Sequence, residues 1–238
     1  MIEIRAEQLR RVHHRGTKEI VALSDVSLTI EPGEFVTISG PSGSGKSTLL
    51  HLLGLIDRPT SGRLVIDNVD TDDLSDDQRA ERRRRTFGFV FQSFLLLPGL
   101  AAWENVALTE LLDGKPLRSQ RDRALQLLGE VGLADRWDHP PHELSGGEQQ
   151  RVAVARALMA DPAVVFADEP TGALDQANSA SVLELLHELT VDRGRSLVVV
   201  THDPNVAALS GATAIRLSDG RIADDLARTD LETGSEAP

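Results

Sequence analysis

The 238-residue sequence contains no cysteine and no tyrosine, and aromatic residues make up only 3% of it. Without cysteine the chain can form neither disulfides nor thiolate metal sites, which makes it compatible with a reducing cytoplasm. The apolar runs at residues 94–103 and 196–200 are much shorter than the roughly 20 residues of a membrane-spanning helix. The first residues also lack the apolar segment of a secretory signal. We therefore expect any role at a membrane to depend on a partner protein.

Positive charge is scarce, because 25 lysines and arginines face 37 acidic residues, which gives a formal net charge of −12. A chain this acidic is not expected to attract nucleic acid phosphates generally, so nucleic acid is not a predicted partner. The run Arg82 to Arg85 could bind RNA or lipid head groups. Because the acidic stretch 70–77 precedes it, we expect the run to balance local acid on a solvated helix.

Hydrophobic patterning predicts an α/β fold. Residues 3–12 alternate like a strand, residues 26–30 read as a second strand, and residues 35–40 form a third that runs into a glycine-rich loop. Helical spacing follows over residues 47–56. The early strands predict an N-terminal antiparallel β part, and the helix after the third strand opens an alternating core.

The hydrophobic pattern becomes typical of helices over residues 93–160. We interpret this stretch as a helical subdomain inserted into an α/β core made of residues 1–92 and 161–228. Within the second part of the core, strands and helices alternate, with a short helix expected after residues 203–204 and a hairpin at 218–221. Continuous apolar strands alternating with helices predict a mostly parallel sheet covered on both faces. We expect residues 229–238 to be a disordered tail.

A phosphate-binding loop is predicted at residues 40–48, where GPSGSGKS fits the pattern G-x-x-x-x-G-K-S. The glycines allow successive backbone N–H groups to face phosphate oxygens, Lys46 adds a cation, and the hydroxyl of Ser47 can bind Mg²⁺. A strand before the loop and a helix after it are the context that this function requires. The predicted nucleotide-binding residues here are Gly40, Pro41, Ser42, Gly43, Ser44, Gly45, Lys46, Ser47 and Thr48.

Four polar side chains follow apolar strands and are the predicted catalytic and metal-binding partners of this loop. Asp168 is expected to hold Mg²⁺, and Glu169 to orient or deprotonate the attacking water. Gln92 could offer its amide oxygen to Mg²⁺ or to that water. His202 could hydrogen-bond a γ-phosphate oxygen, although a single histidine after a strand is more often a satisfied surface residue.

A second candidate anion site begins the helix near residue 146. Ser145 and Glu148 form an S-x-x-E capping box, which by itself would indicate only a well-capped helix. Gly146 and Gly147 are unfavourable in a first helical turn and suggest that the backbone approaches something closely. An anion suits the positive end of a helix, but the residues alone do not reveal whose phosphate it would be.

Taken together, these segments resemble the ATP-binding subunits of ABC transporters, in the order of that family and across most of the chain. The resemblance implies the fold of a P-loop NTPase and Mg²⁺-dependent ATP hydrolysis. The matching segments are residues 40–48 (Walker A), 89–92 (Q-loop), 144–150 (signature), 164–170 (Walker B), 172–175 (D-loop) and 200–203 (switch-histidine loop).

The resemblance also implies a head-to-tail dimer in which two copies of the chain enclose two ATP molecules. Ser145 and Gly147 of one copy would contact the γ-phosphate bound at Lys46 of the other, and Asp175 would lie at the seam. The family usually stacks adenine on an aromatic residue, often tyrosine, near the N-terminus. Since tyrosine is absent, His13 is the candidate for that role and His14 the second choice.

Residues 52–62, 89–108, 146–158 and 167–175 look most like the group of lipoprotein-releasing and macrolide-exporting ATPases, although importers share these stretches. The resemblance implies a separate permease and a peripheral location on the cytoplasmic face of the membrane. Residues 93–106 would receive that permease, or would instead fill the core of the helical subdomain. The alternative function is a regulatory ABC ATPase that controls cell-wall hydrolases through a membrane partner.

Overall fold

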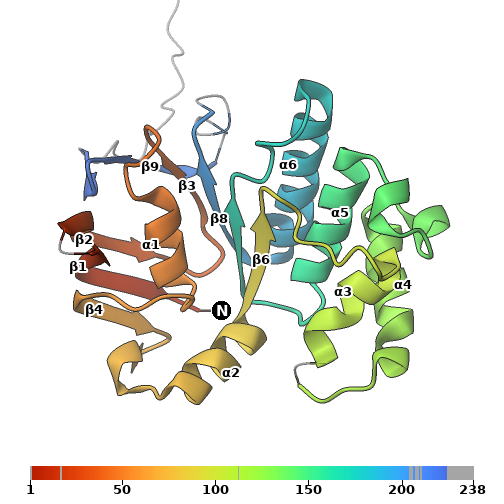
Figure 1. Ribbon diagram of the computed structural model, residues 1–238, viewed down its shortest axis with the longest axis horizontal. Helices are drawn as coiled ribbons and strands as arrows, with labels where there is room; N and C mark the ends of the chain where they lie inside the picture. The colour runs from red at the N-terminus through yellow and green to blue at the C-terminus, as the bar shows by residue number, and fades with distance from the viewer. Residues whose placement is uncertain are drawn as a thin grey trace, which may run out of the picture.

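The computed structural model contains two sheets and two groups of helices (Figure 1). It describes residues 2–16, 18–111, 113–203, 206, 209 and 211–223. The helix expected after residues 203–204 lies mostly outside these residues, and so does the tail at 229–238. The described helices are α1 (Lys46–Leu53), α2 (Asp76–Thr86), α3 (Ala102–Leu111), α4 (Arg121–Glu130), α5 (Gly146–Ala157) and α6 (Gln176–Thr190). Short 3₁₀ turns occur at Thr71–Asp73, Leu117–Gln120, Ala134–Arg136, Pro141–Glu143 and Val191–Arg193.

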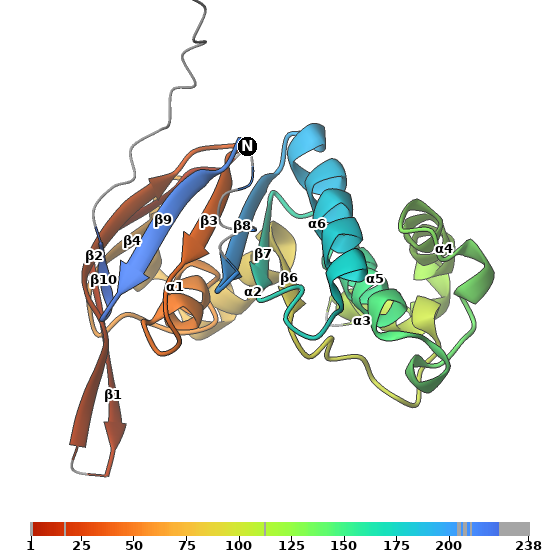
Figure 2. The ribbon, with the colours of Figure 1, turned by 90° about the horizontal axis from the view of Figure 1, so that it is seen from above.

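The smaller sheet is antiparallel and confirms the predicted N-terminal β part. Its strand order is β2-β1-β4-β5, and β1 pairs with both β2 and β4. Figure 2 shows the β1–β2 hairpin projecting beyond the rest of the molecule as a long arm. The strands are β1 (Ile4–Arg15), β2 (Lys18–Ile30), β4 (Ser61–Ile66) and β5 (Val69–Asp70).

The larger sheet has the order β10-β9-β3-β8-β7-β6 and is parallel except for β10. Its strands are β3 (Phe35–Ser39), β6 (Phe87–Phe91), β7 (Val164–Asp168), β8 (Ser196–Thr201), β9 (Thr213–Ser218) and β10 (Arg221–Ile222). The predicted hairpin at 218–221 is present, with Asp219 and Gly220 both at positive φ. Two positive-φ residues match the right-handed twist of the strands that they join. The mostly parallel sheet predicted from the sequence is therefore confirmed.

Apolar residues cover both faces of the larger sheet, as the continuous apolar strands predict. Along β7, Val164 and Phe166 pack with α1 and the smaller sheet, whereas Val165 and Ala167 pack with α5 and α6. The alternation follows from the two-residue period of a strand. Helices α3, α4 and α5 lie between β6 and β7 in the chain and form the far side of the molecule from α1 (Figure 1). Helices α1 and α5 thus lie on opposite sides of the sheet.

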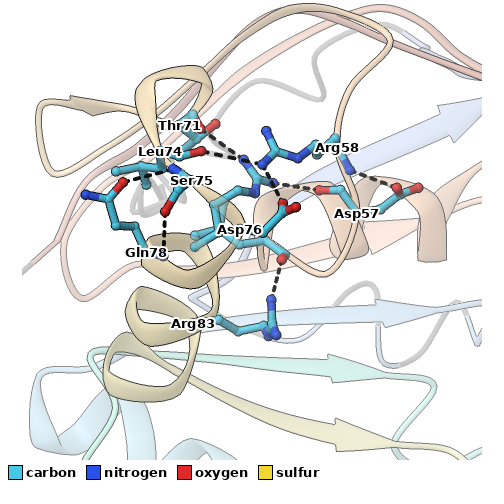
Figure 3. A network of polar contacts seen from close by, with 10 residues as sticks. Asp57, Arg58, Thr71, Leu74, Ser75, Asp76, Gln78 and Arg83 are labelled. Carbon is cyan, nitrogen blue, oxygen red and sulfur yellow. Dashed lines mark hydrogen bonds and ion pairs between the residues drawn. The ribbon is translucent and has the colours of Figure 1, made fainter.

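The arginine run on α2 is used inside the molecule. Arg82 donates to the carbonyl oxygen of Ile66 at 2.7 Å, and Arg83 donates to that of Leu55 at 2.8 Å. Figure 3 shows Arg83 within a network that also joins α2 to the turn before it. The interpretation of Arg82 to Arg85 as a solvated run is wrong for these two residues, because they satisfy carbonyl groups where other elements end.

Candidate functional site

The glycine-rich loop joins β3 to α1 and has a conformation that only glycine adopts readily. Gly40, Gly43 and Gly45 have φ values of 147°, 80° and 100°. A Cβ at Gly40 would lie 2.0 Å from the carbonyl oxygen of Leu217, so no larger residue fits there. Such consecutive turns direct backbone N–H groups to one side and create a cradle for anions.

The fit of this cradle to a phosphate rests on its polar groups. Lys46 is largely buried, and its Nζ donates to the carbonyl oxygens of Gly40 and Pro41 at 2.9 and 3.0 Å. The Oγ of Ser44 is buried and has no hydrogen-bond partner among the described residues. A buried hydroxyl without a partner is costly, and a phosphate oxygen is a suitable acceptor for it. The residues therefore fit a nucleotide phosphate.

A hydroxyl and a carboxylate meet beside the loop, where a divalent ion would sit. Ser47 Oγ donates to Asp168 Oδ1 at 3.0 Å. Burial raises the pKa of Asp168, and the hydrogen bond from Ser47 opposes that shift. Among the described residues no group of three or more His, Cys, Asp or Glu side chains could hold a metal. Magnesium would therefore need phosphate and water oxygens in addition to Ser47 and Asp168, which is its usual mode of binding.

The structure brings Glu169 and His202 together. Glu169 has a φ of 48°, and its backbone N–H donates to the carbonyl oxygen of Val200 at 2.9 Å. His202 Nδ1 lies 2.8 Å from Glu169 Oε2, and the His202 backbone N–H donates to the same oxygen at 3.3 Å. Positive φ is uncommon for a non-glycine residue, so the surrounding contacts hold the backbone of Glu169 in an uncommon conformation.

Gln92 lies beside the same turn. In the parallel pair of β6 and β7, Phe91 is opposite Asp168, so Gln92 and Glu169 leave neighbouring strands at equivalent points. A Cβ at Gly172 would lie 2.7 Å from Gln92 Nε2, which places this amide against the turn after Glu169. The structure thus brings Gln92, Glu169 and His202 to one edge of the sheet. Their individual roles stay predictions.

The second helix start is a capping box, as the sequence predicts. Ser145 Oγ accepts from the backbone N–H of Glu148 at 3.3 Å, and Glu148 Oε2 accepts from that of Ser145 at 2.8 Å. The backbone hydrogen bond from Ser145 lowers the pKa of the Glu148 carboxyl. Glu148 is therefore occupied by its own helix.

The two glycines of this helix start differ in their surroundings. A Cβ at Gly147 would lie 2.6 Å from Asn178 Oδ1, so packing within the chain already explains that glycine. A Cβ at Gly146 would touch nothing closer than 3.6 Å. No contact within the described part of the chain therefore requires glycine at position 146, which agrees with a close approach by another molecule.

Asp175 caps the next helix. Its carboxylate accepts from the backbone N–H of Asn178 at 2.9 Å and from Asn178 Nδ2 at 2.7 Å. These two hydrogen bonds lower the pKa of the Asp175 carboxyl, and the one from the backbone N–H has the larger effect. Through Asn178, the capped start of α6 touches Gly147 at the start of α5. A position at the seam of a dimer stays a prediction for Asp175.

His13 lies on the β1–β2 arm, opposite Ile20 in the antiparallel register, and is exposed. Ala22, two residues beyond Ile20, has its carbonyl oxygen 2.4 Å from the position that a Cβ on Gly45 would take. The base of the arm therefore abuts the glycine loop, and His13 lies a short way out along the arm. This placement is compatible with a contact to the base of a bound nucleotide, and the role of His13 stays a prediction.

The segment after Gln92 contains both exposed and packed apolar side chains. Leu95 and Leu97 are 54% and 46% exposed, whereas Leu96 and Trp103 pack against the core. The interpretation that this segment fills the core of the helical subdomain therefore holds for Leu96 and Trp103, whereas a contact with a permease stays a prediction for the exposed leucines. Asn105 is buried and donates to the carbonyl oxygen of Leu97 while accepting from its N–H.

Sequence reasoning missed several residues that shape this region. Asn105 stands between buried Ala102 and Val106 on α3, and a polar residue on the apolar face of a helix was the signal for it. Arg156 of α5 donates to the carbonyl oxygens of Phe94 and Leu95. Gln150 is also missed, and no local pattern distinguishes it from other polar helix residues.

A phosphate cradle, a hydroxyl–carboxylate pair and an acid at one end of a parallel sheet define a nucleotide-binding protein of the P-loop class. The sequence matches the ABC transporter family over residues 23–172. The chain therefore belongs to the ABC transporter family. None of the described helices has both the length and the hydropathy to cross a membrane.

Curated relatives support this assignment. The chain is 50% identical over 224 residues to the macrolide export ATP-binding/permease protein MacB of Rhodopseudomonas palustris strain HaA2, covering 94% of this chain and 34% of the relative. It is 47% identical to the MacB protein of Burkholderia pseudomallei strain K96243, covering 97% of this chain and 36% of the relative. The chain thus spans about a third of the length of the curated relatives that it matches.

Solved structures agree with the fold. The ATP-binding cassette MJ0796, determined as a dimer in a post-hydrolysis state with ADP and Pi, has a TM-score of 0.84 and 43% identity, covering 93% of this chain and 97% of that one. A second dimeric structure of MJ0796, described as a bacterial ABC transporter cassette, gives the same TM-score at 44% identity and the same coverage of both chains. The fold is that of an ABC cassette.

Proposed function

We propose that this chain is the ATP-binding subunit of an ABC transporter, hydrolyses ATP with Mg²⁺, and drives a separate membrane permease. It would act as a head-to-tail dimer at the cytoplasmic face of the membrane. Export, or mechanical work on parts of the permease outside the cytoplasm, is the favoured direction, because relatives at 47–50% identity are named for macrolide export. The dimer is supported by MJ0796, which was solved as one.

The observation that carries the proposal is the joint placement of Ser47, Asp168 and Glu169. When magnesium is bound, it would neutralise phosphate charge, and Ser47 and Asp168 are the residues that would hold it. Glu169 would orient a water and accept its proton, and His202, whose Nδ1 lies 2.8 Å from Glu169 Oε2, would fix the direction of that carboxylate. The glycine loop and Lys46 would bind the phosphates throughout.

The positions of the two anion sites support the proposal of a second copy. Lys46 begins α1 on one side of the larger sheet, and Ser145 caps the start of α5 on the other side. Both views in Figures 1 and 2 show these helices separated by the strands of the sheet. In a head-to-tail pair, the start of α5 in one copy would face the nucleotide held at the start of α1 in the other.

An affinity isolation from native membranes tests the proposed function as a whole. We expect tagged Glu169→Gln protein, added with ATP to detergent-solubilised membranes, to recover a multi-span protein with a large extracytoplasmic domain. Recovery of ribosomes, nucleic acid or soluble proteins alone would overturn the transporter assignment. A cell-wall hydrolase partner recovered with the membrane protein would instead favour the regulatory alternative.

The exposed leucines after Gln92 are the proposed permease contact. Replacing Leu95 and Leu97 together with Ser should reduce the recovered permease by at least about tenfold, because buried apolar anchors dominate such interfaces. ATP turnover of the isolated subunit should stay unchanged, since both side chains are exposed and neither belongs to the buried core. Ile56→Ser is the matched control, because Ile56 is 42% exposed on another part of the molecule. Unchanged recovery of the permease with the double variant would refute this contact.

Adenine stacking is proposed for His13. His13→Ala should weaken ATP binding about fivefold, in line with the contribution of about 1 kcal/mol or more from stacking one base on a ring. His14→Ala separates the first choice from the second, because neighbouring residues on a strand point to opposite faces and only one of the two variants should lose affinity. Binding titrations with ATP and GTP should also show a modest preference for ATP. A preference for GTP, or equal affinity in the parent and His13→Ala, would rule out the stacking role.

A further inference from the structure

Gln150 is a buried polar residue that none of the predicted site roles uses. It lies on α5, its exposed fraction is 0%, and its side-chain amide contacts two segments far away in the chain. Nε2 donates to the carbonyl oxygen of Pro170 at 2.6 Å and, more weakly, to that of Phe91 at 3.4 Å. Phe91 immediately precedes Gln92, and Pro170 immediately follows Glu169. One amide thus touches the backbone beside both catalytic candidates.

The orientation of this amide is fixed by its partners. Both contacted atoms are carbonyl oxygens, which only accept, so the nitrogen of Gln150 must face them. The other end of the amide, Oε1, is buried and has no hydrogen-bond partner among the described residues. An apolar residue of the same size would avoid this unpaired acceptor. The hydrogen bonds donated by Nε2 hold the two carbonyl groups in place, which an apolar side chain of the same volume would not do.

Gln150 also connects these contacts to the second anion site. It is the fifth residue of α5, whose first turn is held by the Ser145–Glu148 capping box. Helix α5 contacts β6 and α6, so its start, the Gln92 segment and the turn after Glu169 lie together. Because Gln92 itself packs against Gly172 of that turn, a shift of α5 would move both catalytic candidates through one side chain.

We infer that Gln150 is a positioning residue that couples the start of α5 to Gln92 and Glu169. Its donated hydrogen bonds set where the chain leaves β6 and β7, so that occupation of the Ser145 site by the second copy's nucleotide aligns the hydrolytic residues. The inference rests on the proposed function, because alignment matters only if the site hydrolyses ATP. Gln150 has no part in binding the nucleotide held by its own glycine loop.

Gln150→Met tests this role, because methionine keeps the size and burial of the side chain and removes both the donor and the unpaired acceptor. We expect kcat for ATP to fall at least tenfold, while the Kd for ATP changes less than twofold. Hydrogen exchange of the nucleotide-free protein should become at least threefold faster at residues 169–172. Residues 40–48 should exchange as in the parent.

Gln126→Met is the matched control, since Gln126 lies on α4 and, among the described residues, donates only to Glu130 Oε1 of its own helix, at 2.8 Å. It should retain both the turnover and the exchange pattern of the parent. If the parent hydrolyses ATP and the Gln150→Met variant has the same kcat as the parent, the role of Gln150 is refuted and the proposed function is not affected. A parent without any ATP turnover would overturn the proposed function and this inference with it. An equal loss of kcat in both variants would indicate a general effect of placing methionine in this group of helices and would also contradict the inference.

Discussion

Glu169→Gln is expected to keep ATP binding while turnover falls by about 10²–10⁴-fold, the range that a positioned general base contributes. Glutamine has the shape of glutamate and can still contact Nδ1 of His202, 2.8 Å away from the carboxylate, but it cannot take a proton from water. Single-turnover hydrolysis and a separate binding titration measure the two properties. Because ATP is bound and not consumed, the variant should also accumulate as a dimer.

Glu184→Gln is the control for this prediction, because Glu184 is exposed in the middle of α6 and takes no part in the site. It should hydrolyse ATP at the parent rate. If Glu169→Gln also turned over at the parent rate, the assignment of water activation to Glu169 would be wrong. Loss of ATP binding together with turnover would show that this carboxylate serves the nucleotide site rather than the water.

Lys46→Ala should weaken ATP binding by at least about 100-fold, equivalent to about 2.7 kcal/mol. The expected loss is large because the ammonium group of Lys46 is largely buried within the loop that would bind the phosphates. It also donates to the carbonyl oxygens of Gly40 and Pro41 in that loop. Removing it takes away a cation and loosens the cradle. Isothermal titration with ATP, at fixed magnesium and salt, measures the effect.

Thermal unfolding without nucleotide separates loss of the site from loss of the fold. We expect Lys46→Ala to melt within a few degrees of the parent, because α1 is held by its buried leucines. ATP should no longer raise the melting temperature of this variant, because a ligand stabilises only a folded protein that binds it. A variant that ATP still protects to the same extent would contradict the role given to Lys46.

Local patterns predicted much of this site. The glycine loop, the acids after β7 and the Ser145–Glu148 capping box are each encoded within a few residues, and their conformations follow from steric limits and hydrogen-bonding needs. The mostly parallel sheet followed from continuous apolar strands. These features need no knowledge of distant contacts, and the structure has them where the sequence places them.

Long-range contacts account for what the sequence did not reveal. Gln150 bonds to residues 59 and 20 positions away, and Arg83 bonds to a carbonyl group 28 positions away. Nothing in the neighbouring residues indicates which backbone group such a side chain will meet. Gly147 shows the same limit, because the close approach that its presence suggests is made by Asn178 of its own chain.

The mass of the Glu169→Gln protein in solution, measured by light scattering with and without ATP, tests whether the second anion site serves another copy's nucleotide. We predict a monomer of 25.8 kDa without ATP and twice that mass with it. Adding Ser145→Arg should abolish the dimer but leave ATP binding by the monomer. Ser75→Arg, which alters the equivalent capping box on α2, should not affect it. A protein that binds ATP yet stays a monomer, or a dimer that survives Ser145→Arg, would contradict the account.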